Sequence, residues 1–391
     1  MVRCHKTSFY ATQSDIDKLF SCNRISAEIW NSCLDASKAY HLSNGGKWIN
    51  RSELQSAMKG KFPLHSQSIQ AVCHKYLYAR ESARASRLKG EKNKYPYKHK
   101  KNFNTKWIDK AFKIYTNGKI ELSLGMDNGK QRKPITIMCK HIPIGDIKEI
   151  ELIYDRGLMI SICYDDLVPK IEANGSNRAG VDLGEIHSIA AFNENGESLI
   201  ITGRKIRSIH RLRNKKLAEL QKLMSRCKKG SRKWNRYRSV EQFVLSKSAR
   251  QIEDALHKTS RNFTNWCKVN STCEVAVGKI DGIQRGTKGK ISKITSQKLS
   301  NWSFGKLQYY MNYKLKACGI TMLKINESYT TQTCPVCGDR KISYSRNYRC
   351  KCGYSCHRDI HGARNILSKH LNGGDIVYVA DIKNQKYLRI A

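Results

Sequence analysis

Four closely spaced cysteines near the C-terminus constrain the fold of this chain more than any other feature. They form two pairs, in TCPVCG and CKCGY, with twelve residues between the pairs: Cys334, Cys337, Cys350 and Cys352. Two close cysteine pairs, each followed by glycine, are typical of a structural zinc site. The second pair has one intervening residue instead of two, so Cys356 or His357 is an alternative fourth ligand. Four thiolates leave no open coordination position, and we expect the zinc to fold a loop, not to catalyse.

The charge of the chain predicts a polyanionic partner. Lysine and arginine total 72 against 32 acids, which gives a formal net charge of +40 over 391 residues. Binding to a nucleic acid is the direct interpretation, because each neutralised phosphate releases condensed counterions. A ribosome-associated protein and a membrane-surface binder are alternatives. The second is disfavoured because no basic amphipathic helix with a clean apolar face lies near either end.

The same reading predicts a cytoplasmic, nucleoid-associated protein with no membrane partner. The first twenty residues contain no apolar run of the kind that a signal peptide needs, and no stretch reaches the length of a membrane span. Outside the C-terminal cluster, the 15 cysteines are mostly scattered singly. Such cysteines are typical of buried thiols in a reducing compartment.

The N-terminal half reads as a small β-domain with a helical insertion. Residues 14–88 repeat apolar positions at helical spacing, and residues 111–164 alternate as short strands, with Asn117-Gly118 at a hairpin turn. An initial strand in residues 1–9 would complete a small barrel or sandwich. Between helices and strands, GEKNKYPYKHKKNFNTKW mixes lysines with aromatic residues. Tyr95, Tyr97 and Trp107 are candidates for base stacking, and a solvated basic linker is the alternative.

The C-terminal half has a ribonuclease-H-like order of elements. RAGVDLG, HSIAAFNENG and ESLIITG read as three consecutive strands, and long helices, the buried strand CEVAVGKI, another helix and the strand ITMLKINE follow. Asp182 lies inside the first of these strands, where a carboxylate is costly to bury unless it binds a metal or a strong donor. Asp359 lies at the start of the last predicted helix, where stabilisation of the helix dipole is the alternative explanation.

Two segments carry a family resemblance. The run KINESYTTQTCPVCG…YRCKCGYSCHRDIHGARNIL resembles the C-terminal signature of the TnpB proteins of bacterial insertion sequences, and GVDLGEIHSIAAF resembles their first RuvC motif. The resemblance covers about residues 178–367, and over the N-terminal half it rests on layout alone. It implies an RNA-guided DNA endonuclease with a guide RNA from the transposon end, double-stranded target DNA beside a short adjacent motif, and magnesium-dependent hydrolysis, with two ions expected.

The resemblance also implies an α+β multidomain fold with a β-barrel-like wedge domain, a helical recognition insertion and an RNase H-like (RuvC) α/β domain interrupted by a zinc knuckle. The expected boundaries are residues 1–10 and 105–170 for the wedge, 11–104 for the recognition helices, 176–330 and 354–370 for the RuvC-like domain, 331–353 for the knuckle, and 371–391 for a C-terminal tail without an assigned role.

The middle catalytic acid departs from the usual family pattern. Most TnpB proteins have a glutamate at the end of the strand CEVAVGKI, where this chain has Gly278. Glu274 stands at the wrong end of that strand, and Asp281 comes three residues late. Glu327 ends the neighbouring strand, so its carboxylate is expected to reach the same pocket, as in the serine-recombinase-associated TnpB subgroup and in Fanzor proteins. A nuclease-dead RNA-guided repressor is the alternative.

We therefore expect Asp182, Glu327 and Asp359 to hold the magnesium. The candidates for contact with phosphate are four basic residues: Arg358, Lys205, Arg207 and Arg211. His187 and His361 are interpreted as structural, because two-metal cleavage does not require a histidine. A DNA-binding accessory protein of transposition that uses no guide RNA is a further alternative.

Overall fold

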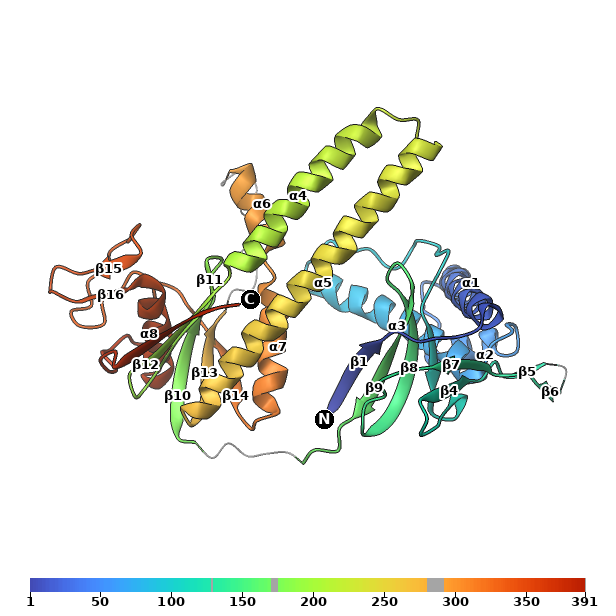
Figure 1. The fold of residues 1–391 in the computed structure, drawn as a ribbon, viewed down its shortest axis with the longest axis horizontal. Coiled ribbons are helices and arrows are strands. Elements are labelled where there is room, and N and C mark those ends of the chain that lie inside the picture. Colours follow the sequence, from blue (N-terminus) through green and yellow to red (C-terminus); the bar gives the residue numbers. More distant parts are fainter. Residues whose placement is uncertain (128, 170–174, 280–291, 391) are drawn as a thin grey trace. The chain divides into compact units, whose positions relative to one another are not determined.

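The computed structural model describes residues 1–127, 129–169, 175–279 and 292–390. They divide into two units, Met1–Pro169 and Lys170–Ala391 (Figure 1). Asp281, which the sequence analysis considered as a late middle acid, lies outside the described residues.

Two antiparallel sheets build the first unit. The N-terminal strand β1 runs antiparallel to β9, the last strand of the unit, as the predicted completion of the β-domain requires. The four-stranded sheet has the order β1-β9-β8-β2, with bounds Val2–Thr7, Leu158–Asp165, Asp146–Tyr154 and Thr105–Ile108. The three-stranded sheet has the order β3-β4-β7, with bounds Phe112–Ile114, Lys119–Leu122 and Ile135–Met138. A 3-10 turn η1 (Asp109–Ala111) and the short hairpin of β5 (Met126–Asp127) and β6 (Lys130–Gln131) complete the β-structure.

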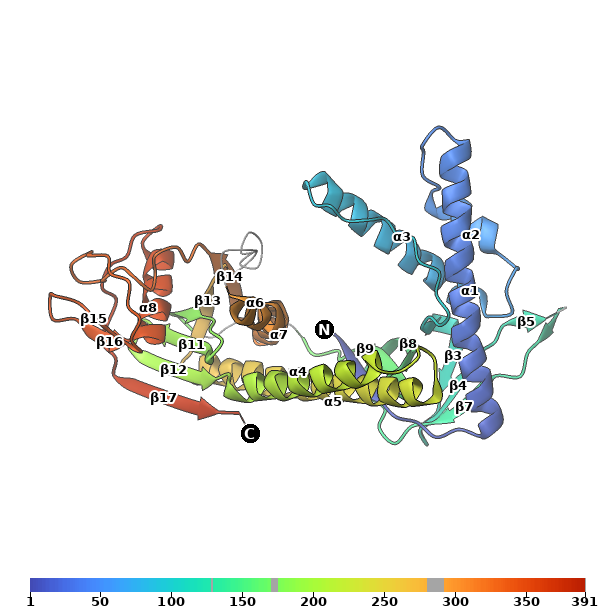
Figure 2. The ribbon, with the colours of Figure 1, turned by 90° about the horizontal axis from the view of Figure 1, so that it is seen from above.

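Three helices are inserted between β1 and β2, as predicted: α1 (Gln13–Ser43), α2 (Arg51–Met58) and α3 (Ser66–Leu88), drawn in blue in Figure 2. Side chains that accept backbone N–H groups fix where α1 and α2 begin. Thr12 caps α1, and Asn50 and Glu53 form a reciprocal capping box on α2. The buried faces of these helices share one apolar core with the strands.

Trp107 belongs to that core, so its prediction as a base-stacking residue is wrong. Its side chain is 0% exposed, and its Nε1 donates to the carbonyl oxygen of Ser123 at 2.9 Å. The reason is that the basic segment ends earlier than expected. The strand β2 begins at Thr105, and the alternation of the strand turns Thr105 and Trp107 into the core.

A six-stranded mixed sheet is the centre of the second unit. Its order is β14-β13-β10-β11-β12-β17, with bounds Thr321–Ile325, Thr272–Gly278, Asn177–Asp182, His187–Asn193, Glu197–Thr202 and Asn384–Arg389. β10, β11 and β12 run antiparallel in succession, and β13 and β14 lie parallel to β10. These directions are those of the layout that the sequence predicted for the first five strands.

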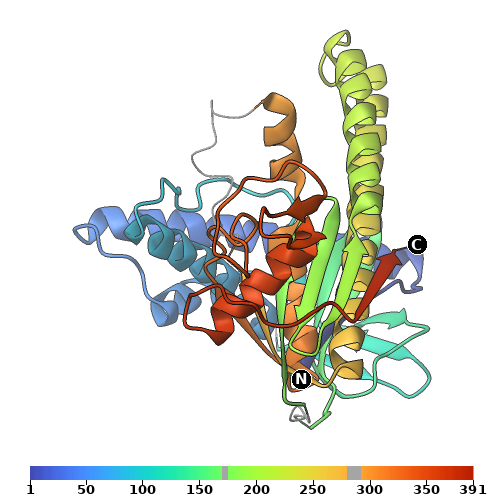
Figure 3. The same cartoon turned by 90° about the vertical axis from the view of Figure 1, so that its left-hand side faces the viewer.

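Helices cover both faces of this sheet (Figure 3). One face packs on α5 (Arg232–Val269) and α7 (Phe304–Lys316), and the other packs on α8 (Arg358–Leu371). α5 is a single helix of 38 residues, where the sequence left one or two helices open. It forms a long antiparallel hairpin with α4 (Arg204–Ser225) that extends beyond the sheet in Figure 1. α6 (Lys293–Asn301) precedes α7, and β15 (Asn347–Arg349) and β16 (Ser355–His357) form a small hairpin in the cysteine segment.

The C-terminal tail, for which no role was predicted, supplies the sixth strand. β17 pairs in parallel with β12 over Asn384–Arg389, and Ile390 is buried beside the sheet. The run before it, Val379 to Ile382, packs against the core around α8. The tail is therefore part of the second unit.

Candidate functional site

Two of the predicted acids meet at the end of the six-stranded sheet. Asp182 is the last residue of β10, and Asp359 lies in the first turn of α8, which packs across β10. Both line a cavity of about 380 Å³, together with His187, Arg346 and Arg358. The close approach of α8 to β10 depends on a glycine, because a Cβ on Gly362 would stand 2.9 Å from Oδ2 of Asp182.

Glu327 fills the space that Gly278 leaves open. β13 and β14 are parallel neighbours, and Gly278 is paired with Ile325, two residues before Glu327. A Cβ on Gly278 would lie well inside the 3.0 Å that real Cβ contacts respect, and the nearest atom is the Oε2 of Glu327. The strand itself ends at Ile325, slightly earlier than predicted. The carboxylate of Glu327 thus lies where a side chain on residue 278 would begin.

The acids influence one another electrostatically. Burial, followed by the charges of Asp359 and Glu327, raises the pKa of Asp182 from 3.8 to about 7. Burial also raises the pKa of Glu327. For Asp359, burial acts to raise the pKa, but a hydrogen bond from His187 and the charges of His187, His357 and Arg358 lower it overall. A site in which carboxylates resist ionisation in this way is suited to a bound cation.

The groups of potential metal ligands in the structure differ from the predicted set of three acids. Among the described residues, two groups have ligand atoms that all lie within 4.8 Å of one another: the four cysteines, and His187 with His357 and Asp359. The set Asp182, Glu327 and Asp359 is not a third such group. Asp182 and Asp359 line the cavity described above and Glu327 does not, and the three carboxylates are farther apart than ligands already gathered around a single ion.

His187 holds the carboxylate of Asp359. Its Nδ1 lies 2.6 Å from Oδ2 of Asp359, and its ring lies edge-on to Tyr387 of β17 with centroids 5.8 Å apart. The sequence analysis interpreted His187 as structural. The contact gives it a positioning role at the site, and no local sequence pattern predicts this role, because the partner lies 172 residues away. His361, also interpreted as structural, is buried and stacks on Tyr348 at 4.0 Å.

The four cysteine sulfurs converge as predicted. Sγ of Cys334 and Cys352 are 3.6 Å apart, and Sγ of Cys337 and Cys350 are 3.5 Å apart. Tetrahedral zinc with Zn–S bonds of about 2.3 Å places its sulfurs roughly 3.8 Å apart, so the donor set fits this ion. Backbone N–H donation from Cys352 leads the causes that lower the pKa of Cys350 to about 7, which favours a thiolate. Cys356, the alternative ligand, is buried and is not a member of the cluster.

Two arginine side chains line the cavity together with Asp182 and Asp359. Nε of Arg358 lies 3.6 Å from Oδ1 of Asp359, and Nη1 of Arg346 lies 3.8 Å from Oδ2. The sequence analysis proposed Arg358 as a contact to phosphate and missed Arg346, which lies in the cysteine segment without a distinguishing local pattern. Both guanidinium groups stand beside the carboxylate and line the same cavity.

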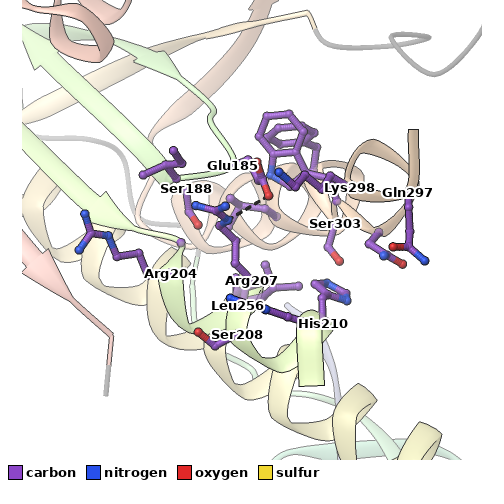
Figure 4. Close-up of a pocket in the computed structure, with 18 of the residues that line it drawn as sticks. Glu185, Ser188, Arg204, Arg207, Ser208, His210, Leu256, Gln297, Lys298 and Ser303 are labelled. Atoms are coloured by element: carbon purple, nitrogen blue, oxygen red, sulfur yellow. Dashed lines mark ion pairs between the residues drawn. The ribbon is translucent and has the colours of Figure 1, made fainter. Parts of the chain in front are cut away.

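The candidate phosphate contacts of α4 lie next to this cavity. Arg207 and Arg211 line a second cavity of about 670 Å³, drawn in Figure 4, and Nε of Arg207 lies 3.0 Å from Oε1 of Glu185. Lys205 lies in the first turn of α4 and does not line that cavity.

The remaining aromatic candidates belong to the first unit. Tyr95 packs against Trp48, with centroids 5.1 Å apart, and the guanidinium of Arg87 lies over its ring. The side chain of Tyr97 is 55% exposed, with the ammonium groups of Lys94 and Lys98 near its ring. Tyr97 therefore stays a candidate for stacking, whereas Tyr95 already has partners on its ring. No described helix is long and apolar enough to cross a membrane.

Two family models match parts of the second unit, and one of them begins in the last strand of the first unit. Residues 161–284 match the OrfB_IS605 family, described as a probable transposase, and residues 304–366 match the Cas12f1-like TNB domain. The chain belongs to the TnpB family. The TNB match contains the cysteine cluster, Glu327 and Asp359, and the OrfB_IS605 match contains Asp182 and Gly278.

Several TnpB relatives align with parts of the chain. A TnpB-like protein of Methanocaldococcus jannaschii is 26% identical over 200 residues, which are 50% of this chain and 69% of that protein. The CRISPR-associated endodeoxyribonuclease Cas12f1 of Sulfoacidibacillus thermotolerans is 27% identical over 223 residues, 54% of this chain and 50% of that protein. InsQ of Escherichia coli is 31% identical over 167 residues, 39% of this chain and 41% of that protein. The chain thus spans about half or less of two of these three relatives.

One solved structure has a similar fold. A Cas12f1 in complex with sgRNA and target DNA matches with a TM-score of 0.65, at 16% sequence identity, over 91% of this chain and 83% of that chain. At this identity the match shows that the fold is shared. It agrees with the mixed α/β architecture predicted from the sequence.

Proposed function

We propose that this TnpB protein is an RNA-guided DNA endonuclease of a bacterial insertion sequence, with an RNase H-like (RuvC) nuclease domain in its second unit. The observation that carries the proposal is the place of Glu327. Its carboxylate occupies the space above Gly278, beside a strand that ends on Asp182 and a helix that carries Asp359 in its first turn. A metal pocket needs a third carboxylate at that point in space, whichever strand supplies it.

Magnesium is the ion that we propose for this pocket. Asp182, Glu327 and Asp359 would hold it, because Mg²⁺ prefers oxygen ligands, and burial together with the charges of Asp359 and Glu327 raises the pKa of Asp182. When bound, one or two such ions would supply a nucleophile at neutral pH and stabilise the charge that develops in phosphodiester cleavage. The chain's own contribution is positional. His187 fixes Asp359, and Arg346 and Arg358 offer guanidinium groups to a phosphate oxygen.

The partners that we propose follow from the charge and the relatives. The net charge of +40 suits a long polyanion, and the similar Cas12f1 structure was solved with sgRNA and target DNA. We infer a guide RNA from the transposon end and a double-stranded target beside a short adjacent motif. The zinc knuckle at residues 331–353 would help to feed single-stranded DNA to the acids. A DNA substrate would associate the protein with the nucleoid.

A cleavage assay tests the proposal. The protein, its copurified RNA and a matching DNA are incubated with magnesium, and cut products are measured. Glu327→Ala should abolish cutting and leave guide-dependent DNA binding intact. Glu274→Ala is the matched control, because that carboxylate binds His370 at the opposite end of β13 and should not affect the chemistry.

Each other outcome supports a different function. Guide-dependent binding without any cutting by the wild type would favour the RNA-guided repressor. The absence of a defined transposon-end RNA among the copurified nucleic acids would favour the DNA-binding accessory protein. Cutting that survives Glu327→Ala would show that another residue serves as the middle acid.

A further inference from the structure

A second cavity of about 670 Å³ opens beside the acidic cavity (Figure 4). Its walls come from the loop between β10 and β11, the first three turns of α4, and the segment that joins α6 to α7. Four residues line both cavities: Glu185, Ile186, Trp302 and Arg346. The two cavities are therefore adjacent parts of one cleft, with the acids in one part and the start of α4 in the other.

His210 gives the second cavity an unsatisfied polar group. Both ring nitrogens are buried, and neither has a hydrogen-bond partner among the described residues. Burial and the charge of Arg213 lower the pKa of His210 to about 4, so the ring is neutral at physiological pH. A neutral imidazole offers one donor and one acceptor, the combination that the edge of a nucleobase also carries. Buried polar groups without partners are uncommon, and a ligand is one explanation for such a group.

The rest of the lining combines cations with apolar surface. The basic lining residues are Arg204, Arg207, Arg211, Lys298 and Arg346. Glu185 is the one acidic residue among the described lining residues, and it is already paired with Arg207. Trp302 adds an aromatic side chain at the junction of the two cavities. Cations for a backbone and an aromatic face for a base are the two elements of a single-stranded nucleic-acid site.

We propose that this cavity binds the base of one nucleotide of single-stranded DNA, next to the phosphate that the acids cleave. The inference rests on the proposed nuclease function and adds a subsite to it. Its volume lies within the range of about 300–1,000 Å³ that is usual for small-ligand sites, which leaves room for one nucleotide. His210 contacts the edge of the base, Trp302 contacts its face, and Arg211 and Lys298 contact the flanking backbone. Seating the base there fixes the register of the strand across Asp182 and Asp359.

Photo-crosslinking tests where the base lies. The protein is assembled with its guide RNA and a target DNA that carries 5-iodouracil at one position near the mapped cut, with calcium in place of magnesium. After irradiation, the crosslinked peptides are identified by mass spectrometry. We expect one position of the DNA to crosslink to peptides that contain Trp302 or His210. Crosslinks that map only outside the cavity would overturn the inference.

A variant cycle tests what the base contributes. An abasic site at the crosslinking position removes the base, and His210→Leu removes the ring nitrogens at similar volume. Because one base–aromatic stack or edge contact is commonly worth about tenfold or more in binding, each change alone should slow cleavage about tenfold. The two changes together should cost little more than the abasic site alone, because the abasic site already removes the contact with His210. Additive losses at every DNA position would contradict the subsite.

Conservative and distant variants serve as controls. His210→Gln keeps one donor and one acceptor and should recover most of the rate that His210→Leu loses. Arg211→Ala should weaken the crosslink, whereas Lys216→Ala, also exposed on α4 but outside the lining, should not. Melting temperatures close to that of the wild type exclude a folding defect.

The outcomes separate this inference from the nuclease proposal. Cutting by the wild type without a crosslink in the cavity would refute the subsite and leave the nuclease intact. A crosslink at Trp302 or His210 in a protein that never cuts would refute the nuclease, and the cavity would remain a base-binding site of a DNA-binding protein.

Discussion

At the scale of single residues, the candidate site depends on Gly278 and Glu327 together. Neither residue would attract attention by itself, because a glycine at the end of a strand and a glutamate after the next strand are both common. Gly278 ends β13, and Glu327 follows the parallel neighbouring strand β14. The glycine is required for this position of the glutamate, because any Cβ at residue 278 would collide with the carboxylate of Glu327. The carboxylate of Glu327 lies in the space that a side chain at residue 278 would take.

This steric relation predicts that Gly278→Ala impairs cutting. The added methyl group would displace the carboxylate of Glu327, and a loss of about 1.4 kcal/mol in transition-state stabilisation corresponds to about tenfold in rate. We expect cleavage to fall about tenfold or more in single-turnover assays, with DNA binding unchanged. In a Glu327→Ala background the same change should cost nothing further. An undiminished rate for Gly278→Ala would contradict the assigned place of Glu327.

Asp182 predicts a pH effect on stability in the absence of metal. Its pKa is about 7 in the folded chain against an ordinary 3.8, so the folded protein holds this proton more tightly than the unfolded chain. That contribution to stability is fully present below about pH 3.8, falls steadily as the pH rises from there to about 7, and is absent above about 7. Asp359 acts in the opposite sense, but its pKa is lowered below 3.8 and it titrates outside this window.

We therefore expect Asp182→Asn to stabilise the metal-free protein, and to do so more at about pH 8 than at about pH 5, where less of the protonation-linked stability of the wild type has been lost. A gain on the order of 1 kcal/mol would raise the melting temperature by about 2–4 °C for a domain of this size. Thermal melts with a chelator, at both pH values, measure the difference. An equal shift at the two pH values would mean that the ionisation of Asp182 is not the cause.

The sequence could single out Asp182, Glu327 and Asp359 as candidate metal ligands because they stand in a recognisable order around the cysteine cluster. It could not identify His187 or Arg346, because both act through contacts with Asp359 that only the folded chain creates. It mistook Trp107 for a surface residue because a short strand begins at Thr105, directly after a lysine-rich segment. Local composition predicts exposure there, and the tertiary packing overrides it.

At the scale of elements, the strands and helices with apolar periodicity were predictable and the polar ones were not. The buried strands β10, β11 and β13 stand out from their sequences, as does the long helix α4. β17 has the sequence NQKYLR and an almost fully exposed pattern, so nothing local marks it as the sixth strand. Its place comes from the free edge of β12, with which it pairs in parallel, and from the packing of Leu388 against the core.

The cysteine segment is an element whose order should depend on zinc. It contains one small hairpin, β15–β16, and its buried Tyr348 stacks on His361 of α8. A structural zinc site supplies folding energy that so short a segment cannot obtain from its own core. Removal of zinc with a chelator should raise hydrogen exchange in residues 334–357 and leave β10, β11 and β13 protected. Cys227→Ser, at a cysteine outside the cluster, is the control and should bind zinc as the wild type does. Unchanged exchange in the segment after zinc loss would contradict this role.

At the scale of the whole molecule, the net positive charge is the feature that predicts what kind of partner the chain binds. The excess of 72 basic over 32 acidic residues is distributed through both halves of the sequence, so it cannot serve the acidic cavity alone. The carboxylates of Asp182, Glu327 and Asp359 would repel DNA unless cations around them overcame that repulsion. The basic lining of the neighbouring cavity supplies part of them.

This balance predicts a steep salt dependence of binding but not of cutting. Each phosphate that the protein neutralises contributes about −0.9 to the slope of log K against log salt, so six to ten contacts would lower the affinity about 10³–10⁵-fold between 50 and 200 mM. Titrations of the guide-loaded protein with labelled target DNA measure this slope. Lys216→Ala should leave it unchanged if that residue is solvated, whereas loss of a true phosphate contact reduces it by about 1. Once the DNA is bound at saturation, the cleavage rate should vary far less with salt, because the acids act on a phosphate already in place. A shallow slope for binding would mean that the positive charge of this chain serves something other than nucleic acid.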